Sequence, residues 1–506
     1  MSRPDILIVL SDQHSAACAG FAGNGVVETP NLDRLAAGGT VFEAAYTSCP
    51  LCVPARAGLL TGQTAAQTGI FTNHDIIASD QATFLHSLAA VGYETVLCGR
   101  MHFKGPDQRH GFTRRIFPDV THAYGGGISD FGPFSGVVGM GGCVDMIGAG
   151  NSPVLEYDRQ VTERAVDYLE KDHEKPQCIV LGTYGPHFPY VAPRDLYEKY
   201  LDTVRVPESF HSEMDTYHPV TESKAQRTRH NLVEGADEAV TENIAQAARA
   251  AYYGMISFLD RRIGLVREAW LEHLDRTGRR SLFLYTSDHG DTVGEHGVFG
   301  KQTFYEGSSR IPMIVEGAGV REGGRIASPV SILDIGPTLC DVTRATTPPR
   351  ASGKSLLEAI ETGAEDPERA VLSEYMEGLN GKLHPGRMIR RGRWKLVHYH
   401  GLGEHDLLFD IDSDPEETQN LAKEYPEKAD ALRSALKRDW EVDRLKAHRR
   451  ERDHHGRLIR NWAEAVEPAE LEHWVAPEEA CEMPSVIAGA GSPRETDFFH
   501  RTGNNP

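Results

Sequence analysis

The sequence lacks the features that would assign it to a membrane or to nucleic acid. No apolar run approaches the length that crosses a bilayer, and no basic stretch followed by an apolar core opens the chain. Basic residues are the minority charge: 53 Lys and Arg stand against 73 Asp and Glu, a net charge of −20. We therefore expect no signal peptide, no membrane association and no nucleic-acid partner, because an acidic chain without a basic run binds polyanions poorly.

Cysteine is scarce and follows no spacing pattern. The 506 residues include eight cysteines: Cys18, Cys49, Cys52, Cys98, Cys143, Cys178, Cys340 and Cys481. Scattered cysteines in a large chain without a leader are typical of buried free thiols rather than of a disulfide framework. This pattern predicts a cytoplasmic protein.

Nucleotide-binding loops and internal repeats are missing as well. The glycine-rich stretch 125–150 follows no clear strand and lacks the G-x-G-x-x-G spacing, so we interpret it as a flexible loop near the site. The polar stretch 208–242 is interpreted as a surface excursion.

Short apolar runs predict a buried parallel sheet. Residues 6–10, 95–98, 178–183 and 281–286 are each apolar and each end at polar or glycine residues. Such runs fit strands that are buried on both faces of a mostly parallel sheet. Between them we expect helices, one over residues 31–37 and a long amphipathic one over about 238–274, or two helices that meet near Gly264.

The remainder of the chain predicts a second, smaller unit. The acidic segment 361–369 is a predicted linker, residues 371–374, 387–391, 394–399 and 407–412 are predicted strands, and 428–440 is a predicted helix. The fold class is thus α/β: a large mixed, mostly parallel sheet sandwiched by helices, plus a C-terminal α+β domain with an antiparallel sheet. We predict a catalytic domain over 1–368, the α+β domain over 369–445, and a tail over 446–506 that contributes oligomer contacts or a lid.

Chemistry-bearing residues follow the predicted strands. In open α/β sheets, ligands bind at the carboxyl ends of the strands. One edge of the sheet is therefore expected to gather Asp12, Arg100, His102, His187, Asp288 and His289.

A short motif gives these residues a reaction. The segment Cys52-Val53-Pro54-Ala55-Arg56, followed by Leu60-Thr61-Gly62, resembles the signature that marks type I sulfatases for modification. Segments 29–35, 287–290, 294–297 and 408–421 resemble further motifs of that family, and segment 99–112 is similar to its choline-sulfatase-like branch. The resemblance covers roughly residues 5–422 and implies an alkaline-phosphatase-like fold.

The resemblance implies how the nucleophile arises. In the family a maturation enzyme oxidises the cysteine, here Cys52, to formylglycine, whose hydrated aldehyde attacks sulfur. We expect Cys52 to open a helix, because a helix N-terminus stabilises negative charge. Arg56, one turn on, would hold the diol. The other interpretations are a buried thiol or a Cys49/Cys52 redox pair, which would make Pro54 and Arg56 coincidences.

A metal site is expected beside this nucleophile. Asp12, Gln13, Asp288 and His289 offer oxygen and imidazole ligands from two strand ends, and the resemblance adds the modified Cys52. A mostly oxygen set suits one hard divalent cation, Ca²⁺ first, with Mn²⁺ or Mg²⁺ as alternatives.

The resemblance also implies four further roles. His102 would act as the base for sulfate elimination, His187 would serve the leaving-group oxygen, Lys301 would bind the sulfate, and Asn73 would lie near it. Arg100 stands where many family members have lysine. Because arginine is permanently charged and forks onto two oxygens, we assign Arg100 to substrate binding.

One departure leaves a second reaction open. Many sulfatases carry Asp-Asp where this chain has Asp12-Gln13, a pair shared with the choline-sulfatase-like branch and with phosphonate monoester hydrolases. The hypotheses are a sulfatase acting on a small or soluble sulfate ester, and a phosphonate monoester or phosphodiester hydrolase. An inactive binding relative is the third, and the intact Cys52 and Lys301 oppose it. Residues 449–506 lack a recognisable choline-specific ending, so the alcohol stays open. Expected partners are a formylglycine-generating enzyme and, in a homo-oligomer, further copies of the chain.

Overall fold

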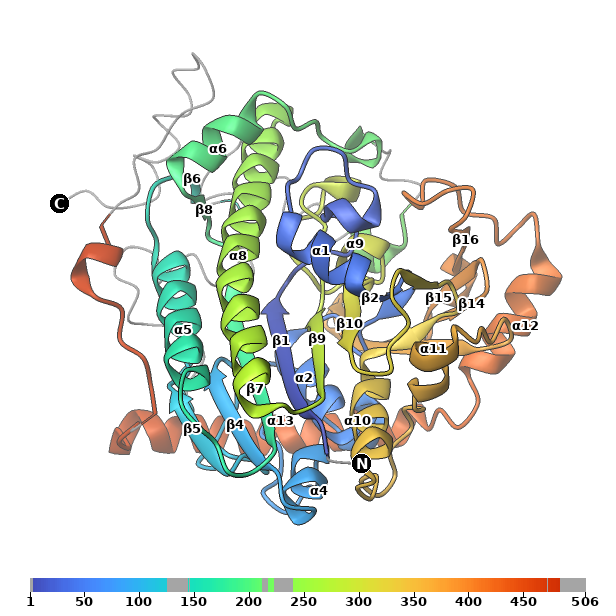
Figure 1. Cartoon of the computed structure of the whole chain (residues 1–506). Coiled ribbons are helices and arrows are strands. Elements are labelled where there is room, and N and C mark those ends of the chain that lie inside the picture. The colour runs from blue at the N-terminus through green and yellow to red at the C-terminus, as the bar shows by residue number, and fades with distance from the viewer. Residues whose placement is uncertain are drawn as a thin grey trace.

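A large mixed sheet forms the centre of the molecule. The computed structural model describes residues 3–124, 144, 146–211, 217–222, 240–470 and 472–482. Within them, eight strands form one sheet (Figure 1), in the order β11 (Gly324–Ile326), β2 (Gly39–Phe42), β10 (Met313–Gly317), β9 (Ser281–Ser287), β1 (Asp5–Asp12), β7 (Gln177–Pro186), β4 (Glu94–Gly99) and β5 (Arg114–Phe117). β10 runs antiparallel to both neighbours, and the other strand pairs are parallel.

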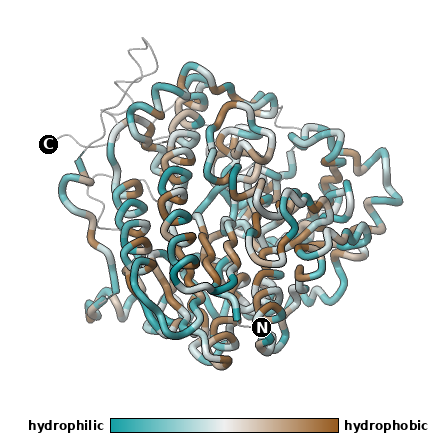
Figure 2. The backbone as a smooth tube through the Cα atoms, in the orientation of Figure 1, coloured by the Kyte–Doolittle hydropathy of each residue, from teal (hydrophilic) through white to brown (hydrophobic). Residues whose placement is uncertain are grey.

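The central strand shows why the predicted runs are apolar throughout. Along β1, Leu7 and Val9 belong to one buried apolar cluster, whereas Ile6, Ile8 and Leu10 belong to another. Successive side chains of a strand point to opposite faces, so a sheet with helices on both faces needs apolar residues at every position. Figure 2 shows apolar residues concentrated in these central strands.

Helices cover both faces of the sheet (Figure 1). One face carries α1 (Pro30–Gly38), α5 (Pro153–Leu169) and the long helix α8 (Glu242–Thr277), with α6 (Arg194–Leu201) packed on α8. The other carries α2 (Cys52–Thr61), α4 (Phe84–Ala90), α10 (Ile335–Thr343) and α11 (Leu357–Thr362). No helix among the described residues is both long and apolar enough to cross a membrane.

Shorter elements complete this layer. They are the strand pairs β3 (Ala45–Tyr46) with β12 (Val330–Ser331) and β6 (Ile147–Ala149) with β8 (Tyr190–Ala192), the helices α3 (Ala65–Thr68) and α9 (Glu306–Ser309), and the 3₁₀ turns Gly20–Ala22, Glu208–His211, Glu295–Gly297, Ile332–Asp334, Gly403–His405 and Glu478–Ala480.

A second, antiparallel sheet follows. It consists of β13 (Ala370–Leu379), β14 (Lys382–Arg391), β15 (Trp394–Tyr399) and β16 (Leu407–Asp410), in that order. Helix α12 (Pro426–Leu436) packs on one face through Leu432 and Leu436, and the other face packs on the first unit through residues such as Phe304. The structure thus confirms the predicted α/β fold with a smaller C-terminal unit.

Several predicted boundaries differ from the structure. The helix predicted over 238–274 is one continuous helix through Gly264, and it begins at Glu242. The helix predicted over 428–440 ends at Leu436, before Asp439, whose φ of 56° a helix cannot continue. The unassigned tail begins inside a further helix, α13 (Val442–Val466). Most of the loops predicted over 125–150 and 208–242 lies outside the described residues.

Candidate active site

The register of two neighbouring strands brings the first two acidic residues together. β1 and β9 run parallel, with Ser11 opposite Ser287. Asp12 and Asp288 are the residues that follow this pair along the chain, so both carboxylates emerge at the same edge of the sheet. Both are fully buried.

Helix α2 brings a cysteine to that edge. It begins at Cys52, and all ten of its residues are buried. Cys52 therefore lies in the first turn, where backbone N–H groups lack intrahelical acceptors and favour a negatively charged neighbour. The expectation that Cys52 opens a helix is confirmed.

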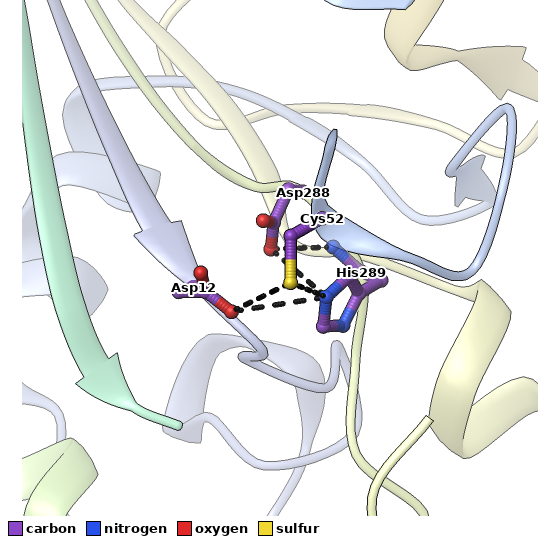
Figure 3. A group of neighbouring side chains, drawn as sticks. All are labelled: Asp12, Cys52, Asp288 and His289. Atoms are coloured by element: carbon purple, nitrogen blue, oxygen red, sulfur yellow. Dashed lines mark hydrogen bonds and ion pairs between the residues drawn. The ribbon is translucent and has the colours of Figure 1, made fainter. Parts of the chain in front are cut away.

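Four side chains converge around one point (Figure 3). His289 Nε2 lies 3.2 Å from Cys52 Sγ, 3.7 Å from Asp12 Oδ1 and 3.6 Å from Asp288 Oδ1, and Cys52 Sγ lies 3.8 Å from Asp12 Oδ1. Ligands held about 2.0–2.5 Å from one ion are separated by distances of this size. The two carboxylates and the imidazole therefore fit a single divalent cation beside the cysteine.

Two buried arginines brace the carboxylates. Arg56 donates from Nε to Asp288 at 2.8 Å and from Nη2 to Asp12 at 3.1 Å, while Arg100 Nε donates to Asp12 at 2.8 Å. Burial alone would raise the pKa of Asp12, but Arg100, His187, Lys301 and Arg56 hold it well below the ordinary value. Asp12 is therefore an anion at every physiological pH.

Lys301 links the cysteine to a histidine. Its Nζ lies 3.0 Å from Cys52 Sγ, 2.9 Å from Gln13 Oε1 and 2.7 Å from His187 Nε2. His187 Nδ1 donates to the Phe188 carbonyl at 2.7 Å, so Nε2 is the unprotonated nitrogen that accepts from Lys301. Burial and then Lys301 lower the pKa of His187 well below its usual range.

Asn73 lies on another side of the cysteine. It accepts a hydrogen bond from Val53 N at 3.0 Å, and its amide nitrogen donates to Cys52 Sγ at 3.7 Å. Among the predicted residues, Asp12, His289, Lys301 and Asn73 thus contact Cys52 directly.

His102 is one step removed from the cysteine. Its Nδ1 accepts from Arg100 Nη2 at 2.7 Å, which leaves Nε2 as the hydrogen-bearing nitrogen of a neutral ring. Burial and then Arg100 lower the pKa of His102 well below its usual range. The base role that the resemblance implies therefore requires Arg100 to leave Nδ1.

Gln13 is oriented by a residue that the sequence analysis missed. Asp291 accepts from Gln13 Nε2 at 2.5 Å and from Tyr190 Oη at 2.7 Å, and these bonds turn the amide oxygen of Gln13 toward Lys301. Asp291 closes the segment Ser287-Asp288-His289-Gly290-Asp291, so its place beside a predicted ligand pair was the available signal.

The electrostatic environment separates Cys52 from the other cysteines described. All seven cysteines described, Cys52 included, are free thiols. Burial raises the pKa of Cys49 well above its ordinary value and that of Cys18 to about 12. At Cys52 burial and Asp12 also raise the pKa, but Lys301 and His289 outweigh them and lower it. An anion is stabilised at this position, and a Cys49–Cys52 disulfide is not formed.

The mixed sheet and its flanking helices form an alkaline-phosphatase-like fold, in which the acidic strand ends face a helix that begins at a buried cysteine. The sequence profile described as Sulfatase matches residues 4–345, and one described as N-sulphoglucosamine sulphohydrolase, C-terminal, matches residues 294–445. The chain belongs to the sulfatase family and is a sulfuric ester hydrolase.

Individual relatives agree with this family. The choline-sulfatase of Rhizobium meliloti (strain 1021) is 34% identical over 445 residues, which cover 83% of each chain. The arylsulfatase of Clostridium perfringens (strain 13 / Type A) is 28% identical over 87% of this chain and 95% of its own. The phosphonate monoester hydrolase from Silicibacter pomeroyi shares the fold, with a TM-score of 0.71 and 22% identity over 89% of this chain and 96% of its own.

Proposed function

We propose that the protein hydrolyses a small sulfate ester to an alcohol and inorganic sulfate, with formylglycine made from Cys52 as the nucleophile. The observation that carries this proposal is the environment of Cys52. It alone among the described cysteines has a lowered thiol pKa, and it contacts Lys301, His289 and Asp12 at a helix N-terminus. Its Sγ stands in for the oxygens that formylglycine would carry.

Formylglycine would supply a hydrated aldehyde: one hydroxyl would attack sulfur as the alkoxide leaves, and the other would give its proton to a base, the role assigned to His102, as sulfate leaves and the aldehyde forms again. Asp12, Asp288 and His289 would hold a divalent cation beside it, with Gln13 as a further proposed ligand. The cation supplies charge neutralisation for sulfuryl oxygens. We favour Ca²⁺ for the oxygen-rich set, and the imidazole makes Mn²⁺ the first alternative. Elemental analysis of protein purified without chelator identifies the ion.

The chain's own cations bind and orient the substrate anion. Lys301 remains protonated, because Cys52 and Asp12 outweigh the burial that would lower its pKa. Its ammonium thus presents donors where the sulfate oxygens would lie, with Asn73 beside it. Arg100, also permanently charged, holds Asp12 and is assigned to the substrate's negative charge.

The leaving-group oxygen needs a proton. Neutral His187 has none on Nε2, but Lys301 donates to that nitrogen at 2.7 Å. We assign proton delivery to the Lys301–His187 pair, in which the lysine's proton passes to the imidazole and then to the departing alkoxide.

A phosphonate monoester or phosphodiester hydrolase remains the second candidate. Two observations favour it: the fold likeness to the phosphonate monoester hydrolase, and the neutral Gln13 beside Asp12. Either reaction requires a maturation enzyme that modifies Cys52. Buried free thiols fit a reducing compartment such as the cytoplasm.

One experiment tests the proposal. Protein from its native host is analysed by peptide mass spectrometry across Cys52, and turnover of 4-nitrophenyl sulfate is compared with that of an aryl phosphonate monoester. We expect formylglycine and preference for the sulfate. Modified protein that prefers the phosphonate would establish the second candidate, and modified protein inactive on both would refute hydrolysis.

A further inference from the structure

The C-terminal segment reaches back to the active-site edge of the sheet. After α13, which runs along the base of the molecule, the chain passes beside α5 and β5 (Figure 1). We call residues 468–470 and 472–474 the C-terminal strap. Residues 468–470, 472 and 473 of the strap, together with residues 105–109, 121, 123 and 124, line a cavity of about 400 Å³. Beside the cavity the strap is held by polar contacts, whereas its Trp474 is packed in the core.

These contacts fall on β5 and on the loops that precede and follow it. Glu470 accepts from His122 Nδ1 at 3.1 Å and from the backbone N–H groups of Ala123 and Tyr124 at 2.9 and 3.4 Å. Glu472 accepts from Arg109 at 2.7 Å and from Arg115 at 3.0 Å. The strap is therefore fastened by two carboxylates, each with more than one donor.

The backbones of strap and loop also pair at one residue. Asp119 N donates to the Glu472 carbonyl at 3.2 Å, and Trp474 N donates to the Asp119 carbonyl at 2.7 Å, which makes a parallel bridge between Asp119 and His473. Trp474 is buried against Tyr157 and donates from its indole to Gln160 at 3.0 Å. The strap thus holds the backbone of Asp119.

The side chain of Asp119, in turn, holds the segment that carries His102. One carboxylate oxygen accepts from the backbone N–H groups of Met101 and His102, both at 2.8 Å. The other accepts from Thr121 N and Oγ1 at 2.9 and 2.7 Å, and Thr121 Oγ1 in turn accepts from Arg100 at 2.5 Å. His102 has a φ of 58°, a conformation that a non-glycine residue keeps only where its surroundings impose it.

We propose that Asp119 is the positioning residue for His102 and Arg100, and that the C-terminal strap is what keeps Asp119 in place. The inference rests on the proposed function, because it assigns the strap a catalytic consequence through His102. Residues more than 340 positions apart in the sequence thereby support one side of the nucleophile, although none of the strap residues named above touches Cys52 in the described structure.

Three side chains between the strap and the loop could in principle hold a metal, but their geometry does not favour one. His122, Glu470 and His473 are donors of the right kind, with ligand atoms within 4.8 Å of one another. However, the two imidazole rings stack with centroids 4.0 Å apart and planes 21° apart, so their in-plane lone pairs run side by side. Glu470 is also already committed to three donors. The carboxylates of Glu470 and Glu472 and their donors therefore form a hydrogen-bonded clasp, without a metal.

The test compares three double variants of the full chain. Glu470→Ala with Glu472→Ala removes the clasp, and Glu470→Gln with Glu472→Gln keeps oxygen acceptors and should restore part of it. Glu478→Ala with Glu479→Ala is the control, because it removes the same charge from exposed positions nearby. Amide hydrogen exchange of peptides covering 100–104, kcat, KM and Tm are measured for each.

We expect the alanine pair at 470 and 472 to raise exchange over 100–104 and to lower kcat roughly 10- to 100-fold at an unchanged KM, since small misplacements near a reacting group have effects of this size. Asp119→Asn should act in the same direction. The control should match the wild type. Unchanged exchange over 100–104, or raised exchange with wild-type kcat, would overturn the inference. Exchange needs no turnover, so a wild type that hydrolyses no sulfate ester would refute the proposed function alone.

Discussion

Two buried lysines of this molecule have opposite surroundings. Lys301, at the active-site edge, contacts Cys52, Gln13 and His187. Lys395, on β15, contacts two carboxylates, those of Glu306 at 2.9 Å and Glu417 at 2.8 Å. Both side chains are almost completely shielded from water, so burial alone does not identify a functional lysine.

The partners make the difference. Lys395 joins the smaller unit to α9 of the larger one, and its two acids share one cation. Burial would raise the pKa of Glu306, but Lys395 and Arg310 lower it to about 2, while burial raises that of Glu417 to about 7. Lys301 instead contacts a nucleophile, an amide oxygen and a neutral imidazole, and none of these three contacts is a carboxylate. A buried cation without a contacting carboxylate is the arrangement expected of an anion-binding position, which is the role proposed for Lys301.

The largest expected effect concerns the nucleophile that Lys301 contacts. Cys52→Ala should abolish turnover and leave Tm close to the wild type, because the change removes one atom and the proposed chemistry needs it. Activity on 4-nitrophenyl sulfate and thermal unfolding check this. Cys49→Ala, an equally buried cysteine three residues away, is the control and should stay active. A Cys52→Ala variant with near wild-type activity would eliminate the proposed mechanism.

Lys395→Met should affect stability and not catalysis. Removing one partner of a buried ion pair costs roughly 3–5 kcal/mol, because the carboxylate left behind is uncompensated. We expect a lower free energy of unfolding in urea, with kcat unchanged at temperatures well below Tm. Adding Glu417→Gln should recover much of the loss. If the double variant is no more stable than Lys395→Met alone, the two residues are not coupled.

Lys301→Ala should impair catalysis more than stability. We expect kcat/KM to fall about 100-fold, equivalent to about 2.7 kcal/mol of transition-state stabilisation, as for other groups that stabilise developing charge. Stability should change less than in Lys395→Met, since no carboxylate contacts the Lys301 ammonium directly. Steady-state kinetics and urea unfolding of the two variants side by side check the contrast. Wild-type kcat/KM in Lys301→Ala would remove this lysine from the site.

The predictability of these features follows the distance between the residues involved. The strands, and the edge that gathers Asp12, Asp288 and Cys52, were predictable because each lies in a local apolar run or short motif. The residues that hold this edge in place, such as Asp119, were not predictable from the sequence. Asp119 holds His102 from 17 positions further along the sequence, beyond β5, and nothing local distinguishes it from other aspartates. The contacts of the C-terminal strap join segments that only the folded chain brings together.

The contacts of α13 with the active-site side of the molecule were equally unpredictable from the sequence. Its Arg449 is buried against Asp75 at 2.5 Å, and Asp75 accepts from the backbone N–H groups of Phe71 and Thr72, next to Asn73. Only Leu445 and Arg449 are buried along the 25 residues of α13, so its sequence is mostly polar and resembles that of a solvated tail. Such sparse burial leaves no periodic apolar pattern to detect.

The smallest expected effect concerns pH and lies outside the active site. His218 is buried beside Tyr399 and accepts from Val220 N through Nδ1. Burial, and then His405, lower its pKa from the ordinary 6.5 to about 3. Below pH 6.5 the unfolded chain therefore binds a proton that the folded protein excludes until about pH 3, so this residue makes stability fall as the pH falls through that window.

At pH 5 this linkage amounts to about 2 kcal/mol relative to pH 8, at 1.36 kcal/mol per pH unit. His218→Asn keeps an oxygen acceptor for Val220 N and does not titrate, so its free energy of unfolding should depend less steeply on pH between 5 and 8. Any packing cost of the substitution is the same at every pH and cancels in the slope. His454→Asn, on the exposed part of α13, is the matched control and should keep the wild-type slope. An unchanged slope in His218→Asn would show that the pKa of this histidine is the same in the folded and the unfolded protein, and that acid sensitivity arises elsewhere.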